Sequence, residues 1–376
     1  MVAPGDPVKR ESLPACAVLL AGGRGTRFWP RSRTRTPKQL LNIAGDQTML
    51  SETVARLAPL FPLRYFWAVT NVEQAAAVRR EMRGVPASHI LDEPVGRNTA
   101  AAIGLAAFHL THEHGDALMA VLPADSIVAD AARYRKLVRA ALDLARGAGN
   151  LVVLGVPPTR PETGYGYIER GEVSTRPRGV AAYSVRRFTE KPVASLARRY
   201  VASGKYFWNA GMFFWRASTF LDNLKRFLPA THAALAELSK SIGTRQYASA
   251  LRRIYPRLKN ISVDYSVMEP ATRIAGPPRV FVIPAKVGWS DIGSWASVYE
   301  LLASKPGANV SAGEIFALDA SGNYFWSPKK FVAAVGVRDL VLVETPGAIL
   351  LCSRHRSQDV GKIVKWLEEK GRKHLL

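Results

Sequence analysis

A glycine-rich turn directly after an apolar run is the feature that most constrains the fold of this chain. The apolar run is Ala15–Leu20, and Ala21-Gly22-Gly23-Arg24-Gly25-Thr26-Arg27 follows it. We expect a buried strand that ends sharply, because three glycines in four positions give the backbone conformations that other residues resist. Backbone N–H groups in such a turn can surround phosphate oxygens. The pattern is neither a Walker A motif nor the dinucleotide-binding fingerprint, and a simple tight turn remains the alternative.

Helical and strand-like segments alternate through most of the chain, which is typical of an α/β fold. Asn98–His114 and Ala131–Arg146 are predicted helices, since Asn98, Thr99 or Asp130 can cap their first turns and glycines follow their last. Predicted strands are Tyr65–Thr70, Ala117–Leu122, Leu151–Val156 and Val280–Pro284. Three more, Tyr165–Arg170, Ala182–Thr189 and Ala210–Trp215, are predicted to form a more antiparallel insertion. Further predicted helices are Ala194–Ser203, Ser218–Phe227 and Ser294–Leu302.

The C-terminal part of the sequence has a different texture. Short strands separated by Gly and Pro run from the Lys305–Ala308 region to about Leu351, and an amphipathic helix is predicted from about Asp359 to Lys370. We therefore expect a catalytic domain over residues 1–304 and a small β-rich domain with a terminal helix over residues 305–376.

The net charge of the chain is +22, from 52 Lys and Arg against 30 Asp and Glu. Such an excess points to an anionic partner: nucleic acid, a membrane surface or a phosphorylated small molecule. Basic doublets are scattered and form no known nucleic-acid motif, so no nucleic-acid binding is predicted. The apolar stretches are too short for a membrane span, and Met1–Pro14 lacks the apolar region of a signal peptide. A cytoplasmic protein without a membrane partner is expected.

The basic residues are densest immediately after the glycine turn. Cations close to a phosphate-sized cradle suit a triphosphate, whose charges must be neutralised, although a solvated basic loop is the alternative. Pro30 and Pro37 prevent one regular helix there. The residues are Arg24, Arg27, Arg31, Arg33, Arg35 and Lys38.

The complete set of motifs resembles the mannose-1-phosphate guanylyltransferases (GDP-mannose pyrophosphorylases) of the sugar nucleotidyltransferase superfamily. The resemblance is dense from about Ala15 to Trp295 and looser beyond. It implies a Rossmann-like, GT-A-like nucleotidyltransferase domain with a mixed sheet and a small β-rich appendage. The matching segments are Gly22–Pro30, Ser32-Arg33, Pro37-Lys38-Gln39, Glu93–Ala100, Leu122–Asp125, Gly164–Ile168, Phe188–Pro192, Trp208–Phe213, Val263–Glu269 and Gly288–Trp295.

The implied reaction is attack by mannose 1-phosphate on the α-phosphorus of GTP. By resemblance, Gly22, Gly23, Gly25 and Thr26 hold the triphosphate. Arg27 and Lys38 are the implied catalytic residues, which neutralise charge on the transferred phosphate and on pyrophosphate. Asp125 and Asp291 are expected to bind Mg²⁺, a cation that takes few protein ligands and keeps phosphate oxygens and water. Taken singly, each Asp is more often a helix cap or turn residue, and it is the resemblance that favours a metal ligand.

The remaining implied site residues divide between the base and the sugar. Glu93, Gly96, Arg97, Asn98 and Thr99 are expected to surround the guanine, with Glu93 accepting hydrogen bonds that adenine cannot donate, although Asn98 and Thr99 can also cap a helix. Tyr165, Gly166, Glu190, Lys191 and Asn209 are expected to hold the sugar phosphate. At most one of Asp264 and Glu269 is expected to point into the site, because their spacing puts them on different faces of a helix.

Other functions stay open at this stage. A different sugar 1-phosphate or a different nucleoside triphosphate is the main alternative, because base and sugar pockets are where the superfamily diverges. A catalytically silent homologue and a glycosyltransferase of similar fold are weaker ones, the latter because Asp125 lacks an Asp-x-Asp motif. Ser126 and Ala210 replace residues common in the family and could alter rate or sugar preference. An isomerase domain found in longer relatives is not expected, and the β-rich region could form a homodimer.

Overall fold

The computed structural model of the chain describes residues 13–43, 45–277 and 279–376. The first twelve residues, which belong to the predicted catalytic domain and to the segment judged not to be a signal peptide, lie outside the described residues. Within the described part, no helix is both long and apolar enough to cross a membrane.

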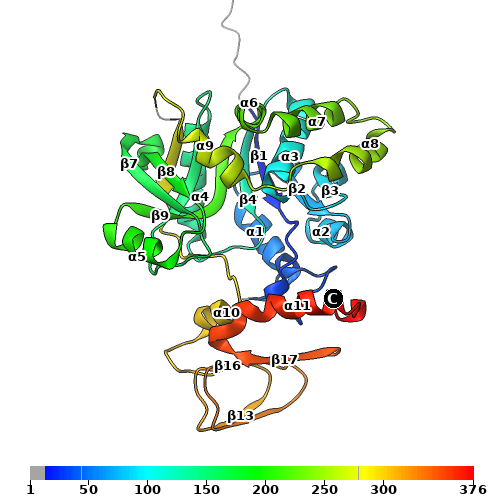
Figure 1. Cartoon of the computed structure of the whole chain (residues 1–376), viewed down its shortest axis with the longest axis vertical. Coiled ribbons are helices and arrows are strands. Elements are labelled where there is room, and N and C mark those ends of the chain that lie inside the picture. The colour runs from blue at the N-terminus through cyan, green and yellow to red at the C-terminus, as the bar shows by residue number, and fades with distance from the viewer. Residues whose placement is uncertain (1–12, 44, 278) are drawn as a thin grey trace, which may run out of the picture.

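A nine-stranded mixed sheet forms the centre of the larger part of the molecule (Figure 1). Its strand order is β3-β2-β1-β4-β9-β6-β10-β8-β7. The strands are β1 (Ala15–Leu20), β2 (Phe66–Asn71), β3 (Ile90–Glu93), β4 (Leu118–Pro123), β6 (Leu151–Val156), β7 (Tyr167–Thr175), β8 (Ala182–Thr189), β9 (Tyr206–Arg216) and β10 (Val280–Pro284). The predicted α/β fold class is confirmed. The predicted antiparallel character of the segment after Gly164 is confirmed as well, since β7, β8 and β9 join the same sheet through antiparallel pairings.

The parallel arrangement of β1 to β4 brings four chain segments to one edge of the sheet. β1 pairs in parallel with β2 and with β4, and β2 pairs in parallel with β3. Because the carboxyl ends of parallel strands meet at one edge, the segments after β1, β3 and β4 lie together. The segments after β1 and β4 carry the glycine turn and Asp125, and Glu93 is the last residue of β3.

Helices cover both faces of the sheet and enclose two hydrophobic cores. One core contains α3 (Asn98–His114), α6 (Ala217–Phe227), α7 (Pro229–Ser239) and α8 (Tyr247–Ile254). The other contains α1 (Met49–Leu57), α2 (Ala75–Glu81), α4 (Ala131–Ala145) and α5 (Ala194–Ser203). The alanine-rich body of α3 packs closely on the sheet, and Asp130 caps α4 by accepting from the Arg133 backbone N–H at 2.8 Å.

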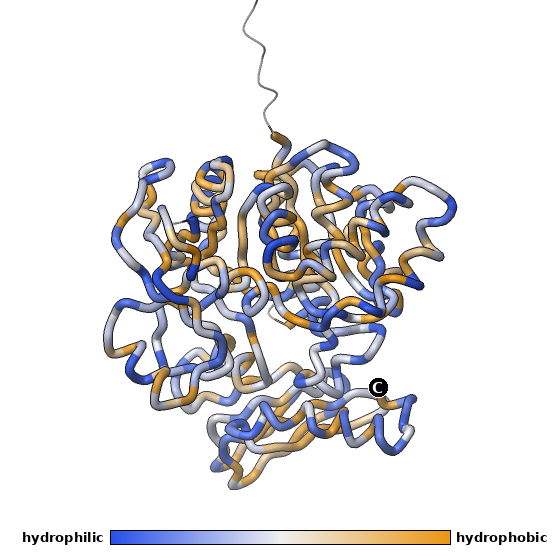
Figure 2. Tube along the Cα trace, turned by 45° about the horizontal axis from the view of Figure 1, so that its top comes forward, coloured by the Kyte–Doolittle hydropathy of each residue, from blue (hydrophilic) through white to orange (hydrophobic). Residues whose placement is uncertain are grey.

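The β-rich region lies below this body in Figure 1. A four-stranded sheet has the order β12-β14-β16-β17, and β13 pairs with β15. The elements are β12 (Val310–Ala312), β13 (Ile315–Leu318), β14 (Tyr324–Trp326), β15 (Val332–Val335), β16 (Leu340–Thr345), β17 (Ala348–Ser353) and the helix α11 (Val360–Glu369). Figure 2 shows hydrophobic segments along the central strands and again along these lower strands.

A third hydrophobic core joins the two parts of the molecule. It combines Phe28 and Trp29, which follow the glycine turn, with Val360, Val364 and Leu367 of α11. The helix α10 (Trp295–Leu302) contributes Trp295, whose ring meets Phe28 edge-on at 5.2 Å between centroids. The segment after the glycine turn is therefore packed against the C-terminal helix, and this contact was not foreseen from the sequence.

Candidate active site

A cavity of about 580 Å³ opens at the carboxyl edge of the parallel strands. We refer to it as the central cavity. All of the sequence-predicted site residues line it except Thr26 and Arg97. They come from segments spread between Gly22 and Asp291, so the fold brings together residues that are distant in sequence.

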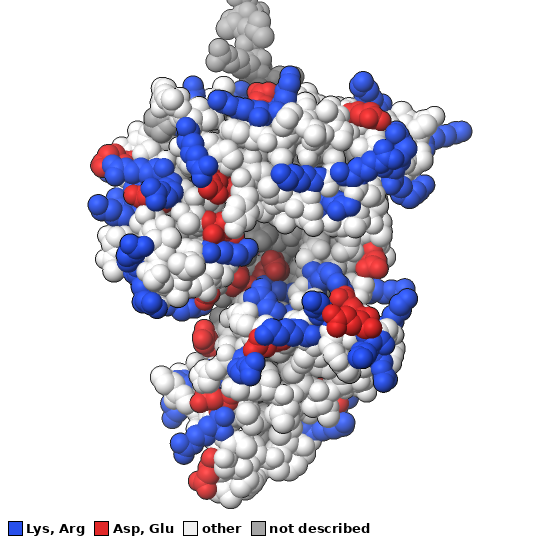
Figure 3. Space-filling model, in the orientation of Figure 1, with Lys and Arg blue, Asp and Glu red and all other residues white. Residues whose placement is uncertain are grey.

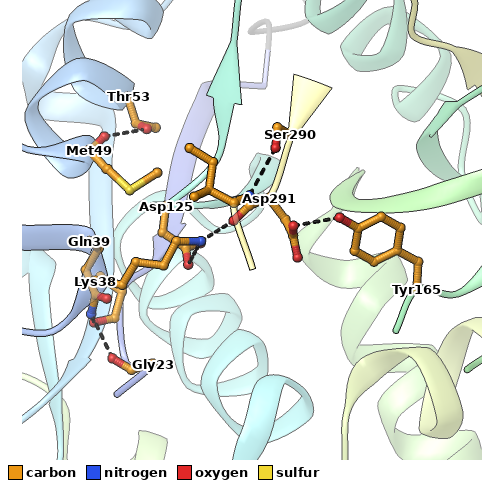
Figure 4. A network of polar contacts seen from close by, with 11 residues as sticks. Gly23, Lys38, Gln39, Met49, Thr53, Asp125, Tyr165, Ser290 and Asp291 are labelled. Atoms are coloured by element: carbon orange, nitrogen blue, oxygen red, sulfur yellow. Dashed lines mark hydrogen bonds and ion pairs between the residues drawn. The ribbon is translucent and has the colours of Figure 1, made fainter. Parts of the chain in front are cut away.

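Lys38 connects the two predicted metal ligands (Figure 4). Its Nζ lies 3.0 Å from Oδ2 of Asp125 and also donates a hydrogen bond to the backbone carbonyl of Asp291. Lys38 is buried, with 6% of its surface exposed, and a buried cation needs such partners. The basic side chain is thus fixed among the acidic ones at the floor of the cavity.

The two aspartates converge because the short strands that adjoin them pair with each other. β5 (Ile127–Val128) begins two residues after Asp125, and β11 (Trp289–Ser290) ends immediately before Asp291. The strands are antiparallel, with Ser290 opposite Ile127. Asp291 therefore lies next to the segment that holds Asp125.

The carboxylates of Asp125 and Asp291 have oxygen ligands of the kind that a hard divalent cation takes. The Tyr165 hydroxyl donates to Oδ1 of Asp291 at 2.6 Å, as Figure 4 shows. Oδ1 of Asp125 and Oδ2 of Asp291 have no hydrogen-bond or ion-pair partner among the described residues. No group of three or more His, Cys, Asp or Glu side chains in the described residues could enclose a metal. Two carboxylates with free oxygens fit a cation that completes its shell with phosphate and water.

The glycine turn is fastened by buried side chains that the sequence analysis gave no role. The Gln39 amide donates to the backbone carbonyls of Ala21 at 2.6 Å and Gly23 at 3.1 Å. Gln39 is also 3.1 Å from Oε1 of Gln74, which is fully buried at the start of α2. Gly25 has φ of 59°, and a Cβ there would lie 2.5 Å from Cβ of Lys38. Only glycine therefore allows the turn to approach Lys38 this closely.

Glu93 reaches the cavity from the end of β3 in an environment that stabilises its protonated form. It is 5% exposed, and the Tyr255 hydroxyl donates to its Oε1 at 2.6 Å. Burial raises the pKa of Glu93 to about 7, although the Tyr255 hydrogen bond and a backbone hydrogen bond from Arg97 oppose the shift. A carboxyl group with this pKa changes charge near neutral pH.

The part of the cavity that contains Glu190, Lys191 and Asn209 has one more carboxyl group, that of Asp264, than the sequence analysis assigned to it. Asn209 donates to Oδ1 of Asp264 at 2.7 Å, and Asp264 lines the cavity. Burial raises the pKa of Asp264 and of Glu190, and the nearby Asp264 adds to the shift of Glu190. Nζ of Lys191 lies 3.1 Å from Oε1 of Glu190. The other oxygen of that carboxyl group, Oε2, is buried with no hydrogen-bond partner among the described residues. A Cβ on Gly166 would lie 2.3 Å from that oxygen.

Three of the six non-glycine residues with positive φ in the described part of the chain lie at the cavity. Asn98, Lys191 and Ile292 have positive φ values of 63°, 46° and 40°, and all three line the cavity. A β-branched residue such as Ile292 is disfavoured in this region. Strain of this kind persists only where the surrounding structure enforces it, and it is frequent at functional sites.

Some predicted residues lie elsewhere. The Arg97 side chain donates to the backbone carbonyl of Pro256, and Thr26 faces Gly361 of α11. Of the basic residues after the turn, Arg27 and Lys38 line the cavity. Arg24 pairs with Glu368, Arg31 lies over the Trp326 ring, and Arg33 donates to the Leu375 carbonyl. Glu269 pairs with Arg273 outside the cavity, whereas Asp264 lines it, which agrees with the expectation that at most one of the two would do so.

The charged surface is mixed rather than uniformly basic. Figure 3 shows Lys and Arg side chains spread over the visible face, with acidic side chains among those around the hollow near its centre. Most of the positive charge thus lies outside the cavity, where Arg27, Lys38 and Lys191 are the basic residues of its lining.

Comparisons with known proteins show the family to which the chain belongs. Residues 16–306 match the family model described as nucleotidyl transferase, and residues 313–367 match a MannoseP isomerase/GMP-like beta-helix domain. The mannose-1-phosphate guanylyltransferase ManC of Salmonella typhimurium is 39% identical over 94% of this chain and 73% of its own length. The Escherichia coli K12 mannose-1-phosphate guanylyltransferase is 38% identical over 94% and 74%.

A solved structure resembles the whole molecule. It is described as mannose-1-phosphate geranyltransferase from Thermus thermophilus, with a TM-score of 0.84 and 34% identity over 95% of this chain and all of that one. The predicted C-terminal β-rich region is confirmed by the beta-helix match and by β12 to β17. The chain therefore belongs to the mannose-1-phosphate guanylyltransferase family of nucleotidyl transferases.

Proposed function

We propose that this chain transfers GMP from GTP to α-D-mannose 1-phosphate, giving GDP-mannose and pyrophosphate. The observation that carries the proposal is the convergence, in one cavity, of the glycine turn, two basic side chains and two carboxylates. The family membership supports the same reaction. An oxygen of the sugar phosphate forms a bond to the α-phosphorus, and the bond from that phosphorus to the bridging oxygen of pyrophosphate breaks.

The residues of the cavity divide the work of bringing two anions together. Arg27 and Lys38 would neutralise charge on the triphosphate, and backbone N–H groups of the glycine turn would hold its oxygens. Lys191 would bind the phosphate of the sugar. Glu190 would accept hydrogen bonds from the sugar hydroxyls, and the Asn209 amide would donate hydrogen bonds to them. Such positioning is the main requirement of phosphoryl transfer, because little covalent chemistry falls to the protein.

Asp125 and Asp291 would hold Mg²⁺, with their unpartnered oxygens as ligands. When bound, Mg²⁺ would supply further positive charge to the phosphates. Glu93 would accept hydrogen bonds from the guanine N1–H and amino group, with Gly96, Asn98 and Thr99 beside it. Two finer assignments also stay proposals: the division at residues 304 and 305, and association of two copies of the chain through the β-rich region.

The test of the proposed function is pyrophosphate release from defined substrate pairs. Purified protein with Mg²⁺ would receive each of four nucleoside triphosphates with mannose, glucose or N-acetylglucosamine 1-phosphate. We expect the highest kcat/KM for GTP with mannose 1-phosphate. The Asp291→Asn variant should lose at least about 100-fold in kcat, because the carboxylate charge is removed while its shape is kept.

A surface substitution provides the control for this assay. Asp143→Asn alters a partly exposed carboxylate that pairs with Arg178, and its kcat should equal that of the unaltered protein. If another substrate pair were preferred, the chain would be a nucleotidyltransferase for that sugar 1-phosphate and nucleoside triphosphate, and the assignment of GTP and mannose 1-phosphate would be wrong. A folded protein without activity towards any pair would contradict the proposal entirely.

A further inference from the structure

The C-terminal helix α11 is fixed against the segment that carries Arg27. Val360, Val364 and Leu367 are buried in one core with Phe28 and Trp29. Gly361 faces the same segment, since a Cβ placed there would lie 3.4 Å from Oγ1 of Thr26. Because buried apolar contacts set this position, the turn that precedes α11 has a defined place beside the glycine turn.

Gln358, in the turn before α11, contacts the catalytic guanidinium directly. Nη1 of Arg27 donates to Oε1 of Gln358 at 2.6 Å. The neighbouring residue Ser357 is buried and is hydrogen-bonded to the backbone N–H of Ala296 and to the Ser294 hydroxyl. The backbone that presents Gln358 is therefore anchored to the catalytic domain on its other side.

The same guanidinium reaches the part of the cavity that contains Asp291. A Cβ added to Gly293 would lie 3.5 Å from both Nη1 of Arg27 and Oδ1 of Asp291. Arg27 thus reaches both the C-terminal segment and the part of the cavity that contains Asp291. The same Nη1 atom donates to Gln358, so this hydrogen bond holds the cavity-facing atom of the guanidinium in place.

The type of partner differs between Arg27 and its neighbour Arg24. Arg24 pairs with the carboxylate of Glu368 at 2.6 Å, so much of its charge is already compensated. Gln358 is neutral, so it can orient Arg27 without compensating its charge. A cation that is held in direction but left uncompensated is suited to a phosphate group.

We propose that Gln358 is a positioning residue for this active site: it orients Arg27 toward the phosphates and thereby makes the C-terminal segment part of the catalytic machinery. The inference rests on the proposed guanylyl transfer. It goes beyond that proposal because it assigns a role in catalysis to the region that follows the nucleotidyl transferase match.

A double-mutant cycle between residues 27 and 358 tests the inference. Arg27→Ala should lower kcat about 100-fold, as the loss of one charge-stabilising donor does. Gln358→Ala should lower kcat about 10-fold and leave the KM for mannose 1-phosphate unchanged, because only the aim of Arg27 is lost. In the Arg27→Ala background, Gln358→Ala should change kcat less than about 2-fold. An equal 10-fold loss in both backgrounds, or no loss in either, would overturn the inference.

The Gln358→Glu variant adds a readout that a purely structural role would not move. The carboxylate keeps the size of the amide but compensates the charge of Arg27, so the KM for GTP should rise about 10-fold. An unchanged KM for GTP would show that Gln358 does not contact Arg27 when GTP is bound, and would contradict the inference. Gln246→Ala, an exposed glutamine before α8, is the matched control and should retain full activity.

Failure of the inference is distinguishable from failure of the proposed function. If Arg27→Ala keeps full activity, the role of Arg27 in the proposed reaction is wrong. If Arg27→Ala is impaired and Gln358→Ala is not, the reaction stands and the role of Gln358 is wrong. Circular dichroism and thermal unfolding of each variant would establish that it is folded.

Discussion

At the scale of single residues, Glu93 has a protonation state that determines which hydrogen bonds it can make. Its pKa is raised to about 7 by burial, so the ionised fraction grows as pH rises through neutrality. The ionised carboxylate is an acceptor only and suits the two donors on the guanine edge, whereas the protonated form can donate. Binding of the guanine ring should consequently favour the ionised form.

We expect the KM for GTP to fall as pH rises from about 6 to 8, with a midpoint near the Glu93 pKa of about 7. Glu93→Gln should raise this KM and remove the part of the pH dependence that belongs to the protein rather than to the phosphates. Tyr255→Phe removes a hydrogen bond that lowers the pKa, so its midpoint should move to higher pH. Steady-state kinetics across this pH range give the KM for GTP of the unaltered protein, Glu93→Gln and Tyr255→Phe. If the unaltered protein and Glu93→Gln have identical pH profiles, Glu93 is not the group that titrates.

The sequence motifs predicted most of the residues that line the cavity, but they could not predict which residues contact one another there. Asp125 and Asp291 were assigned together through the resemblance, while the β5–β11 pairing that joins them is a tertiary contact. Arg97 illustrates the opposite case: its side chain is held by the Pro256 carbonyl, which no local pattern reveals. The roles of the cavity residues remain predictions for experiment.

At the scale of elements, the glycine turn depends on backbone conformation as well as on side chains. At Gly25 a methyl group would lie 2.5 Å from Lys38, and φ of 59° adds strain for any other residue. Gly23 in the same turn has no atom within 4 Å of the corresponding position. Gly23 therefore serves as the matched control for a substitution at Gly25.

Gly25→Ala should lower the free energy of unfolding by about 2 kcal/mol, because strain and overlap act together. Gly23→Ala should change it by less than about 0.5 kcal/mol, as expected for a substitution without new contacts. Chemical denaturation of both variants gives the comparison. Equal stabilities would show that the turn does not have the conformation described.

Some elements with strong local signals were predicted with accurate bounds, whereas α1, α2, α7 and α8 were not predicted, although Thr48 caps α1. The helix α3 begins at Asn98 and ends before Gly115, as its sequence indicates. The helix α8 was missed because Gln246 precedes it instead of a strong cap residue and no glycine directly follows Ile254. The contact between Arg27 and Gln358 spans 331 residues, so only tertiary packing could reveal it.

At the scale of the whole molecule, the β-rich region exposes an apolar surface. Leu318 and Val335 are register partners on β13 and β15, and they are 50% and 60% exposed. Ile349 and Leu351 of β17 are 59% and 62% exposed. These exposed apolar side chains lie on two neighbouring parts of the β-rich region, the β13–β15 pair and the edge strand β17. Burying such side chains would favour association of two copies.

We expect the protein to have twice its 41.1 kDa chain mass in solution. The double variant Leu318→Asp with Leu351→Asp should give the single-chain mass, because burying two carboxylates would oppose association. Val193→Asp, at an exposed site in the catalytic domain, is the control and should leave the mass unchanged. Light scattering after size-exclusion chromatography measures each mass, and a monomeric unaltered protein would contradict the proposal.

The core shared by Phe28, Trp29 and α11 has a consequence for the synthesis of the protein. The ribosome makes the glycine turn early, but Val360, Val364 and Leu367 emerge more than 300 residues later. Until then, the apolar side chains beside Arg27 lack the surface on which they pack. A nascent chain that lacks α11 therefore holds an incompletely packed segment beside Arg27, and we expect catalytic competence only after the residues of α11 have been made.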